Sequence, residues 1–444
     1  MVRRTLTLIG LVVLAMAGAA PASAHGIGGR SDLPVPVSYF IVGAAVVLAL
    51  SFAALAILWP EPRLQEPSRG RVVGRWGRWP IVLAAGVGLV GLALVIGAGI
   101  LGEDRRTNAA PVLLWVYFWL VLPFVGAITG DLYRYLNPWR TMAGDRDRRA
   151  LPAVGSLGIW PATAAFVAFT WLELVHTDSA NPIVLGTAAL LYSLYLGAAV
   201  VLTDKDTAFG SFDAFTSYNA YIGAIAPLEL DTTGEWRWHG WLRRLPQLPV
   251  RRGMAVFVAA MIGTVTYDGL SSTEWWGDTW GSRARDEWFG TIAIVATIAL
   301  IYGAYWLASW GAARAGGGSL SASQVASSFA HTLVPIALAY AVAHYFTLII
   351  FEGQLLVAVA SDPLGLGSDF LGTAANRINF WLSPTSIWYV QLTAILTGHV
   401  AAIVLAHDRA LAIFPKDRAV RSQYAMLGLM VALTGLGLAL LAAG

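Results

Sequence analysis

Residues 37–59 read VSYFIVGAAVVLALSFAALAILW, a run of 23 residues without a charged side chain. A helix rises about 1.5 Å per residue, so a run of this length crosses the hydrocarbon core of a bilayer, which is about 30 Å thick. A single strand would leave its backbone polar groups without partners in lipid, whereas a helix satisfies them internally. The stretch therefore predicts a transmembrane helix.

Similar apolar runs recur along the 444 residues. They lie near 80–102, 110–130, 156–176, 182–202, 252–270, 288–312, 325–350, 386–407 and 423–443. Only 12% of the residues are charged and 57% are hydrophobic, whereas a soluble protein has about 25% charged residues. This composition excludes a disordered chain, a nucleic-acid-binding arm and an ordinary soluble enzyme. It predicts an all-α, polytopic transmembrane bundle of about ten spans, with the lipid bilayer as its surroundings.

The N-terminus has the pattern of a secretory signal. Arg3 and Arg4 precede an apolar stretch, and residues 22–24, Ala-Ser-Ala, form a small-residue cleavage site. We expect residues 1–24 to be a cleaved signal peptide; the alternative is an uncleaved first span. Residues 25–444 would then form one integral membrane domain, with five spans in 25–202, an inner loop at 203–251 and five spans in 252–444.

The basic residues predict the orientation of this domain. Lys and Arg concentrate in loops that face the cytoplasm. With the N-terminus outside, most of the 29 Lys and Arg fall in the inner segments 60–79, 131–155, 203–251, 313–324 and 408–422. The outer segments contain six: Arg30, Arg105, Arg106, Arg283, Arg285 and Arg377. The pattern predicts both termini outside, in a multi-pass protein of the plasma (inner) membrane, and it attributes the basic pI to topology.

Ionisable residues inside a membrane are costly, so each is a functional candidate. The fourth predicted span ends with Glu173 and His176, which are three residues apart and so share one helical face. Metal sites in helical bundles use this Glu-x-x-His spacing. The alternative is a hydrogen-bonded pair at a helix end.

Two later spans contain most of the other polar candidates for a proton path. They are His331, Tyr340, His344 and Glu352 in the eighth span and its end, and His399 and His407 in the ninth. Pro335 is expected to kink the eighth helix and free the carbonyl of His331. The histidine pairs lie about 20 Å apart along one helix and about 12 Å along the other. This mismatch argues against a bis-histidine haem.

A metal site at the outer face is a more consistent grouping. Glu173, His176, Asp268 and His344 all fall in the outer half of the membrane. Imidazole and carboxylate ligands suit a divalent Zn, Mn, Fe or Cu ion. His25, if it becomes the N-terminal residue, would add an amine and an imidazole as a chelate. The chain has no Cys, so thiolate ligands and disulfides are excluded. The alternative is a set of scattered, hydrogen-bonded side chains.

Several short strings together resemble a family of bacterial polytopic membrane proteins identified as fenitrothion hydrolase, a membrane-bound type of phosphotriester hydrolase. They are residues 24–29 (AHGIGG) with 32–34 (DLP), 136–140 (LNPWR), 267–271 (YDGLS), His331 through 344–346 (HYF), 398–400 (GHV) and 406–411 (AHDRAL). The resemblance covers nearly the whole chain. It implies hydrolysis of a small hydrophobic organophosphate triester.

Under that reading a bound metal ion would activate water at the outer face. His176, His344 and Glu173 would be its ligands, and Asp268, with Glu173, would be catalytic. Two other readings stay open. One is a proton-coupled transporter of small solutes or metals, in which the histidines form a proton or substrate path. The other is a membrane scaffold or assembly factor. The sequence indicates no nucleic acid and no particular partner subunit.

Overall fold

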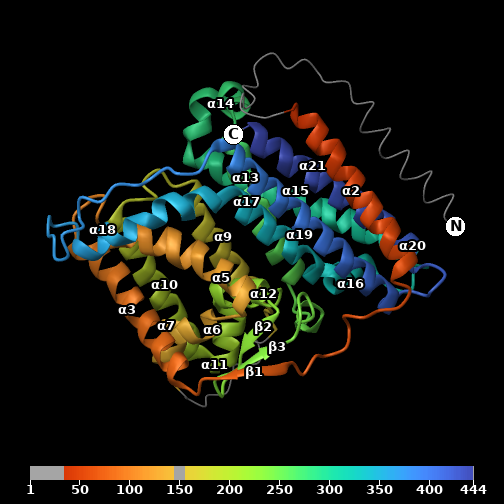
Figure 1. Ribbon diagram of the computed structural model, residues 1–444, viewed down its shortest axis with the longest axis horizontal. Helices are drawn as coiled ribbons and strands as arrows, with labels where there is room; N and C mark the ends of the chain where they lie inside the picture. Colours follow the sequence, from red (N-terminus) through yellow and green to blue (C-terminus); the bar gives the residue numbers. More distant parts are fainter. Residues whose placement is uncertain (1–34, 145–155, 444) are drawn as a thin grey trace. The chain divides into compact units, whose positions relative to one another are not determined.

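The computed structural model describes residues 35–144 and 156–443 of the chain, and the predicted signal peptide and His25 lie outside these ranges (Figure 1). Helices dominate the described residues, and strands are few. The all-α class predicted from the apolar runs is therefore confirmed, and the chain is a polytopic helical membrane protein.

Within the described residues, nine helical segments are long and apolar enough to cross a membrane. They are Val37–Leu58, Trp79–Leu101, Ala109–Thr129, Pro182–Leu202, Met254–Ser271, Glu287–Ala315, Ala322–Ser361, Pro384–Ile413 and Ala419–Ala443. Each coincides with one of the predicted spans. The remaining prediction, 156–176, forms helix α9 (Trp160–Leu174), whose 15 residues are shorter than the other spans.

The chain divides into two compact units, each built from segments that are separated in the sequence. Within the described residues, the first unit comprises 35–67, Met254–His344 and 383–443, and the second comprises 68–144, 156–253 and Tyr345–Leu382. The units group the spans differently from their order along the chain. The first predicted span belongs with the last ones because its helix packs against them.

The first unit is built from long helices that lie side by side. Its elements are α2 (Val37–Leu58), α13 (Met254–Ser271), α14 (Glu274–Trp280), η4 (Gly281–Arg285), α15 (Glu287–Ala315), α16 (Ala322–Phe329), η5 (Ala330–Leu333), α17 (Val334–Glu352, which continues into the second unit), α19 (Pro384–Ile413), α20 (Ala419–Ser422) and α21 (Tyr424–Ala443). Helix α2 packs against α19 and α21, and α13 packs against α15 (Figure 1).

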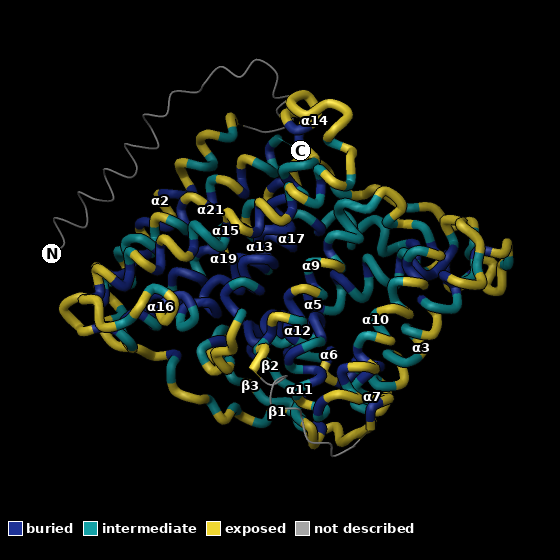
Figure 2. The backbone as a smooth tube through the Cα atoms, turned by 180° about the vertical axis from the view of Figure 1, so that it is seen from behind, coloured by how far each residue is buried: buried dark blue, intermediate teal, exposed yellow. Residues whose placement is uncertain are grey.

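Burial distinguishes the inner helices from those with broad exposed apolar faces. The apolar window of α13 is 72% buried, whereas that of α15 is 28% buried. Figure 2 shows the same contrast, with buried residues continuous along α13 and exposed ones along α15. The exposed faces are apolar, with Ile292, Val295 and Leu300 on α15. Because such faces are stable only in lipid, α13 is an interior helix and α15 faces the bilayer.

A short 3₁₀ turn interrupts the helix of the eighth predicted span. The turn, η5, lies between α16 and α17 and ends just before Pro335. We expected Pro335 to free the carbonyl of His331. In the structure that carbonyl accepts a hydrogen bond from the backbone N–H of Val334, which a 3₁₀ turn permits. The break therefore leaves the His331 carbonyl satisfied.

The second unit combines shorter helices with a small sheet. Its elements are β1 (Arg71–Arg75), α3 (Trp79–Leu101), α4 (Ala109–Pro111), the π-helix η1 (Val112–Val121), α5 (Leu122–Thr129), α6 (Tyr133–Leu136), α7 (Pro138–Ala143), α9, α10 (Pro182–Leu202), α11 (Lys205–Thr207), the π-helix η2 (Ala208–Phe212), α12 (Ala214–Gly223), β2 (Leu228–Leu230), β3 (Glu235–Trp238), η3 (Leu245–Gln247), η6 (Gly353–Leu355) and α18 (Leu356–Ser361).

The sheet joins two predicted inner loops that are far apart in the sequence. Its strand order is β1-β3-β2, and both pairings are antiparallel. Arg71 pairs with Trp238, and Arg75 pairs with Glu235, which also forms a 2.9 Å salt bridge with Arg75. The hairpin from β2 to β3 thus pairs with β1, which lies in the segment that follows α2. The sequence did not predict this pairing.

Candidate functional site

Two of the predicted site residues, Asp268 and His344, contact each other in the first unit. Asp268 lies near the end of α13, and His344 lies in the second half of α17. The His344 Nε2 and Asp268 Oδ2 atoms are 2.8 Å apart. About a fifth of each side chain is exposed. The pair is therefore partly buried, and a carboxylate orients the imidazole.

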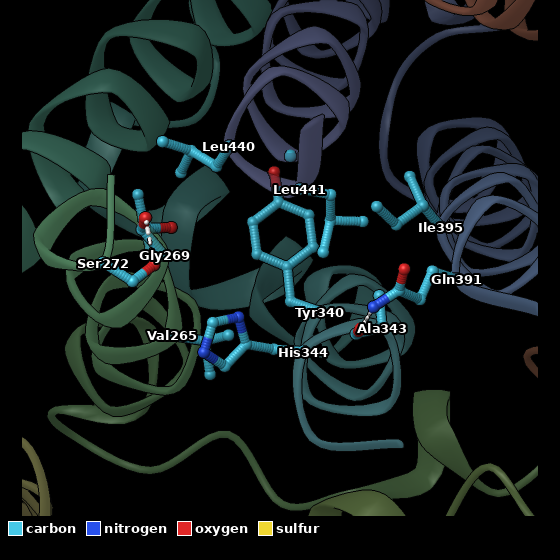
Figure 3. Close-up of a pocket in the computed structure, with 12 residues that line it drawn as sticks. Val265, Gly269, Ser272, Tyr340, Ala343, His344, Gln391, Ile395, Leu440 and Leu441 are labelled. Carbon is cyan, nitrogen blue, oxygen red and sulfur yellow. Dashed lines mark hydrogen bonds between the residues drawn. The ribbon is translucent and has the colours of Figure 1, made fainter. Parts of the chain in front are cut away.

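His344 lines a cavity of about 180 Å³ among four helices (Figure 3). Its walls are Val265, Thr266, Gly269 and Ser272 of α13, Tyr340, Ala343 and His344 of α17, Gln391 and Ile395 of α19, and Gly437, Leu440 and Leu441 of α21. Thr266, Tyr340 and Gln391 are buried, whereas Ser272 is exposed. The cavity therefore opens beside Ser272, at the end of α13.

Small residues bring the four helices close enough to enclose this space. A Cβ atom on Gly437 would lie 3.0 Å from the ring of Tyr340. A Cβ on Gly398 would lie 2.3 Å from the Ala339 Cβ and 2.6 Å from the Pro335 carbonyl oxygen. Glycines at such contacts permit close helix packing in membranes. Larger residues would push α19 and α21 away from α17.

The hydroxyl groups on the cavity wall donate to backbone carbonyls. Thr266 donates to the carbonyl of Ile262 at 2.8 Å, and Ser272 donates to that of Gly269 at 2.9 Å. Tyr340 donates to the carbonyl of Leu433 in α21. These bonds fix the hydroxyl hydrogens away from the cavity, so the wall presents mainly oxygen lone pairs.

Two other predicted histidines are deeply buried in the first unit. His399 is fully buried; its Nδ1 lies 2.8 Å from the carbonyl of Ile395, and its ring centroid lies 5.9 Å from that of Tyr340. His331 is 5% exposed and lies in η5. The Nε2 atoms of both rings have no hydrogen-bond partner among the described residues. Both positions therefore hold imidazoles with one unused polar atom in the protein interior.

His407 belongs to a separate polar cluster with Asp408, near the end of α19. His407 bonds to Gln423 at 2.9 Å and to the carbonyl of Trp59 at 2.9 Å. The Asp408 carboxylate, which is fully buried, accepts hydrogen bonds from four groups of the segment after α2. They are the indole of Trp59, the backbone N–H groups of Arg63 and Leu64, and the amide of Gln65. The cluster anchors that segment, which is a structural role.

The remaining predicted site residues belong to the second unit. Glu173 lies in the last turn of α9, and His176, just beyond it, stacks on Trp171 with ring centroids 5.7 Å apart. Glu352 ends α17. The structure therefore does not group Glu173 or His176 with His344 inside one unit. Among residues 35–144 and 156–443, no group of three or more His, Asp or Glu side chains is placed to hold a metal ion.

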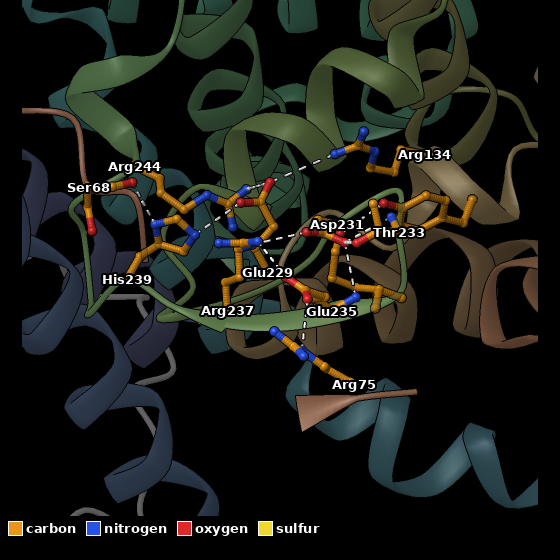
Figure 4. Close-up of polar contacts among 12 residues, drawn as sticks. Ser68, Arg75, Arg134, Glu229, Asp231, Thr233, Glu235, Arg237, His239 and Arg244 are labelled. Carbon is orange, nitrogen blue, oxygen red and sulfur yellow. Dashed lines mark hydrogen bonds and ion pairs between the residues drawn. The ribbon is translucent and has the colours of Figure 1, made fainter. Parts of the chain in front are cut away.

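The second unit contains an ion-pair network that sequence reasoning missed (Figure 4). Glu229 of β2 lies 3.1 Å from His239, 3.4 Å from Arg244 and 3.8 Å from Arg134. Arg237 of β3 bridges Asp231 and Glu235. Strands of three to five residues with alternating charges gave no apolar signal, so only the charge pattern could have indicated them.

Asp131 lies next to this network, just beyond the end of α5, and it gives a pH-dependent prediction. Burial raises its pKa to about 6, although Arg134, Arg244 and Arg140 lower it. The native state therefore binds a proton more tightly than the unfolded state, and stability falls as the pH rises from about 4 to about 6. We expect Asp131→Asn to stabilise the protein by about 1 kcal/mol at pH 7.5, a value discounted for partial exposure.

Thermal unfolding of both proteins at pH 4 and pH 7.5 measures this effect. The difference between Asp131→Asn and the natural protein should disappear at pH 4, because both side chains are then neutral. The backbone N–H of Arg134, which bonds to Asp131, keeps an acceptor in the variant. A variant that is no more stable at pH 7.5 would contradict the assignment.

The fold and the cavity define a class: a polytopic membrane protein with an ionisable pair at a cavity between its spans. Comparison with known protein families, curated proteins and solved structures finds no match to the chain.

Proposed function

We propose that the first unit is a proton-coupled transporter of small solutes and that the cavity among α13, α17, α19 and α21 is its binding site. The observation that supports this most directly is the His344–Asp268 pair at the wall of the cavity. An ionisable residue in a transmembrane helix costs about 2.5–3.5 kcal/mol on insertion, so two that meet at a cavity favour a functional role.

The pair supplies a proton-binding element beside the solute. With His344 protonated, the imidazolium and the Asp268 carboxylate neutralise each other; with His344 neutral, the site has one negative charge. The other groups facing the pair are Tyr340 of α17 and Gln391 of α19, and α21 contributes only Gly437, Leu440 and Leu441. Tyr267 adjoins Asp268 on α13. Proton binding to His344 therefore changes the net charge of the pair beside a bound solute.

Buried imidazoles continue the polar lining into the bundle. His399 touches Tyr340, which lines the cavity. His399 and His331 each keep an unused Nε2 atom, and His407 lies farther along α19. Proton paths in membrane proteins use such buried histidines. We assign His399 and His331 to the proposed proton path that leads from the cavity into the bundle. Both ring nitrogens of His407 are hydrogen-bonded, and this residue keeps its structural role.

The transport proposal includes a location for the protein in the plasma membrane. The signal pattern and the basic inner loops favour the plasma membrane with both termini outside. In that orientation Asp268 and Ser272, at the end of α13, face outward. The cavity would then open to the outer side of the membrane in this structure, as one state of an alternating-access cycle.

Phosphotriester hydrolysis, implied by the family resemblance, is the second candidate function. It is favoured by the carboxylate-oriented imidazole, because a base of this kind activates water. The transition state, however, needs donors or a cation to stabilise charge on the phosphoryl oxygen. The hydroxyls of Thr266, Ser272 and Tyr340 instead donate to backbone carbonyls. The cavity wall therefore supports transport better than hydrolysis.

Reconstitution into proteoliposomes tests the two functions together. A pH-sensitive dye inside the vesicles reports proton movement when small amines, acids, neutral solutes or metal ions are added outside. We expect at least one solute class to move protons about tenfold faster than in empty vesicles. His344→Gln and Asp268→Asn should abolish the signal, because either change removes the coupled pair. His176→Gln, which alters a histidine of the second unit, is the matched control.

The same vesicles, given a nitrophenyl phosphotriester, report hydrolysis by absorbance. Nitrophenolate release that depends on His344, without proton movement for any solute, would favour the hydrolase and overturn the transporter. Proton movement that persists in both variants would also contradict the proposal.

A further inference from the structure

The hydrogen-bond donors and acceptors on the cavity wall indicate which class of solute the cavity binds. Three hydroxyls on its wall, those of Thr266, Ser272 and Tyr340, have their hydrogens committed to backbone carbonyls. The hydroxyl oxygens of Thr266 and Ser272 keep lone pairs that can accept a hydrogen bond. The wall is therefore rich in acceptors and poor in donors.

Gln391 adds a second, independent acceptor. Its amide nitrogen donates to the carbonyl of Ala343 at 2.7 Å, and this bond fixes which end of the amide is oxygen (Figure 3). Its Oε1 atom has no partner among the described residues, although the side chain is only 7% exposed. A buried amide oxygen without a partner costs about 1–3 kcal/mol, so a donor from a ligand would be favourable there.

The charges and the aromatic ring favour a cation. Asp268 places a carboxylate next to the wall through its contact with His344. Figure 3 shows Tyr340 and His344 on α17 beside the other wall residues. The face of a tyrosine ring attracts ammonium groups. Among the described residues, no Lys or Arg lines the cavity.

The volume limits the size of the ligand. In another protein, an apolar cavity of about 150 Å³ binds benzene. The cavity here, at about 180 Å³, has room for a six-membered ring with one substituent. Leu440, Leu441 and Ile395 provide an apolar surface for such a ring.

We infer that the cavity binds a small primary ammonium ion with an apolar body, whose N–H groups bond to Gln391 and the wall hydroxyls. This inference rests on the proposed function, because it takes the cavity as the solute site of the transporter. It names the substrate class that the transport proposal leaves open.

Three ligands of similar shape test the inference with the full-length protein in nanodiscs. Cyclohexylamine is an ammonium donor, cyclohexanone is a neutral acceptor, and cyclohexanecarboxylate is an anionic acceptor. Saturable binding is measured by ligand-observed NMR. We expect cyclohexylamine to bind at least about tenfold more tightly than either of the others, as hydrogen bonds to a charged group predict. Equal or tighter binding of cyclohexanone or the carboxylate would overturn the inference.

Variants locate the binding. Gln391→Leu and Thr266→Val should each weaken cyclohexylamine binding about three- to tenfold, because each removes one acceptor. Thr264→Val is the matched control for Thr266→Val: Thr264 lies on the same helix, is buried and donates to the carbonyl four residues back, but does not line the cavity. It should change binding by less than about twofold. An equal loss in Thr264→Val, or no loss in the two cavity variants, would place the ligand elsewhere and overturn the inference.

Flux measurements separate this inference from the transport proposal. If cyclohexylamine binds as expected but no solute moves protons in proteoliposomes, the ammonium inference is supported and the transport proposal is wrong. If another solute class moves protons in a manner that depends on His344 and cyclohexylamine does not bind, the transport proposal is supported and the ammonium inference is wrong.

Discussion

Asp408→Ala is expected to destabilise the first unit by about 3–5 kcal/mol, the range measured when one partner of a buried charged contact is removed. The carboxylate of Asp408 is fully buried and accepts hydrogen bonds from the segment after α2. Its loss leaves the backbone N–H groups of Arg63 and Leu64 and the Trp59 indole without this acceptor. Thermal unfolding in detergent, followed by tryptophan fluorescence, measures the change.

Two further variants make the result specific. Asp408→Asn keeps one oxygen acceptor and should lose about half as much stability. Asp417→Ala removes an exposed carboxylate that lies 3.6 Å from Arg418, and it should change stability by less than about 0.5 kcal/mol. If Asp408→Ala unfolds at the same temperature as Asp417→Ala, the segment after α2 does not depend on Asp408.

Asp213→Ala should have a comparable effect in the second unit, about 3–4 kcal/mol. Asp213 is fully buried at the N-terminus of α12. Its carboxylate accepts hydrogen bonds from five groups: Tyr133, Asn137, Tyr192, Thr216 and the backbone N–H of Phe215. These donors come from α6, α10, α12 and Asn137, the residue before α7, so the carboxylate joins elements that are distant in the sequence.

Asp213→Asn should be milder than Asp213→Ala. Burial raises the pKa of the Asp213 carboxyl, so the ionised group is costly in the native state, and a neutral amide avoids that cost while keeping one acceptor. Asp206→Ala is the exposed control, since that carboxylate is 87% exposed and bonds only at the surface to Arg140. Unfolding temperatures in which Asp213→Ala matches Asp206→Ala would show that α12 is held by other contacts.

The spans could be predicted from sequence because membrane insertion depends on length and hydropathy alone. The window 37–59 and helix α2 agree to within one residue at either end. The window 156–176 predicted a full span, but α9 has only 15 residues, because residues 156–159 form a turn and Val175 and His176 lie outside the helix. The sheet was missed because β1 and β3 pair across more than 150 residues of chain, a distance over which local patterns carry no information.

The sequence predicted only part of the candidate site, because it shows the depth of each residue in the membrane but not the contacts between helices. Asp268 and His344 were expected in the same half of the membrane, and the structure brings them into contact. The depth of a residue in the membrane can be counted along its helix, but the sequence does not show which helices are neighbours. Glu173 and His176 were therefore included in the group without any local signal that they belong to another unit. Thr266 and Gln391 were not assigned to the site, because the sequence does not show that their helices adjoin α17.

The hydrogen bond between Trp59 and Asp408 joins residues that are 349 positions apart. At a synthesis rate of about 5–20 residues per second, roughly 17–70 s pass between the translation of these two residues. For most of that interval α2 has been made, while α19 and α21, the helices against which it packs, have not. The first span must therefore remain unassembled in lipid, or with an insertion factor, until the ribosome has nearly finished the chain. Assembly of the first unit is consequently a post-insertion event that depends on its last two spans.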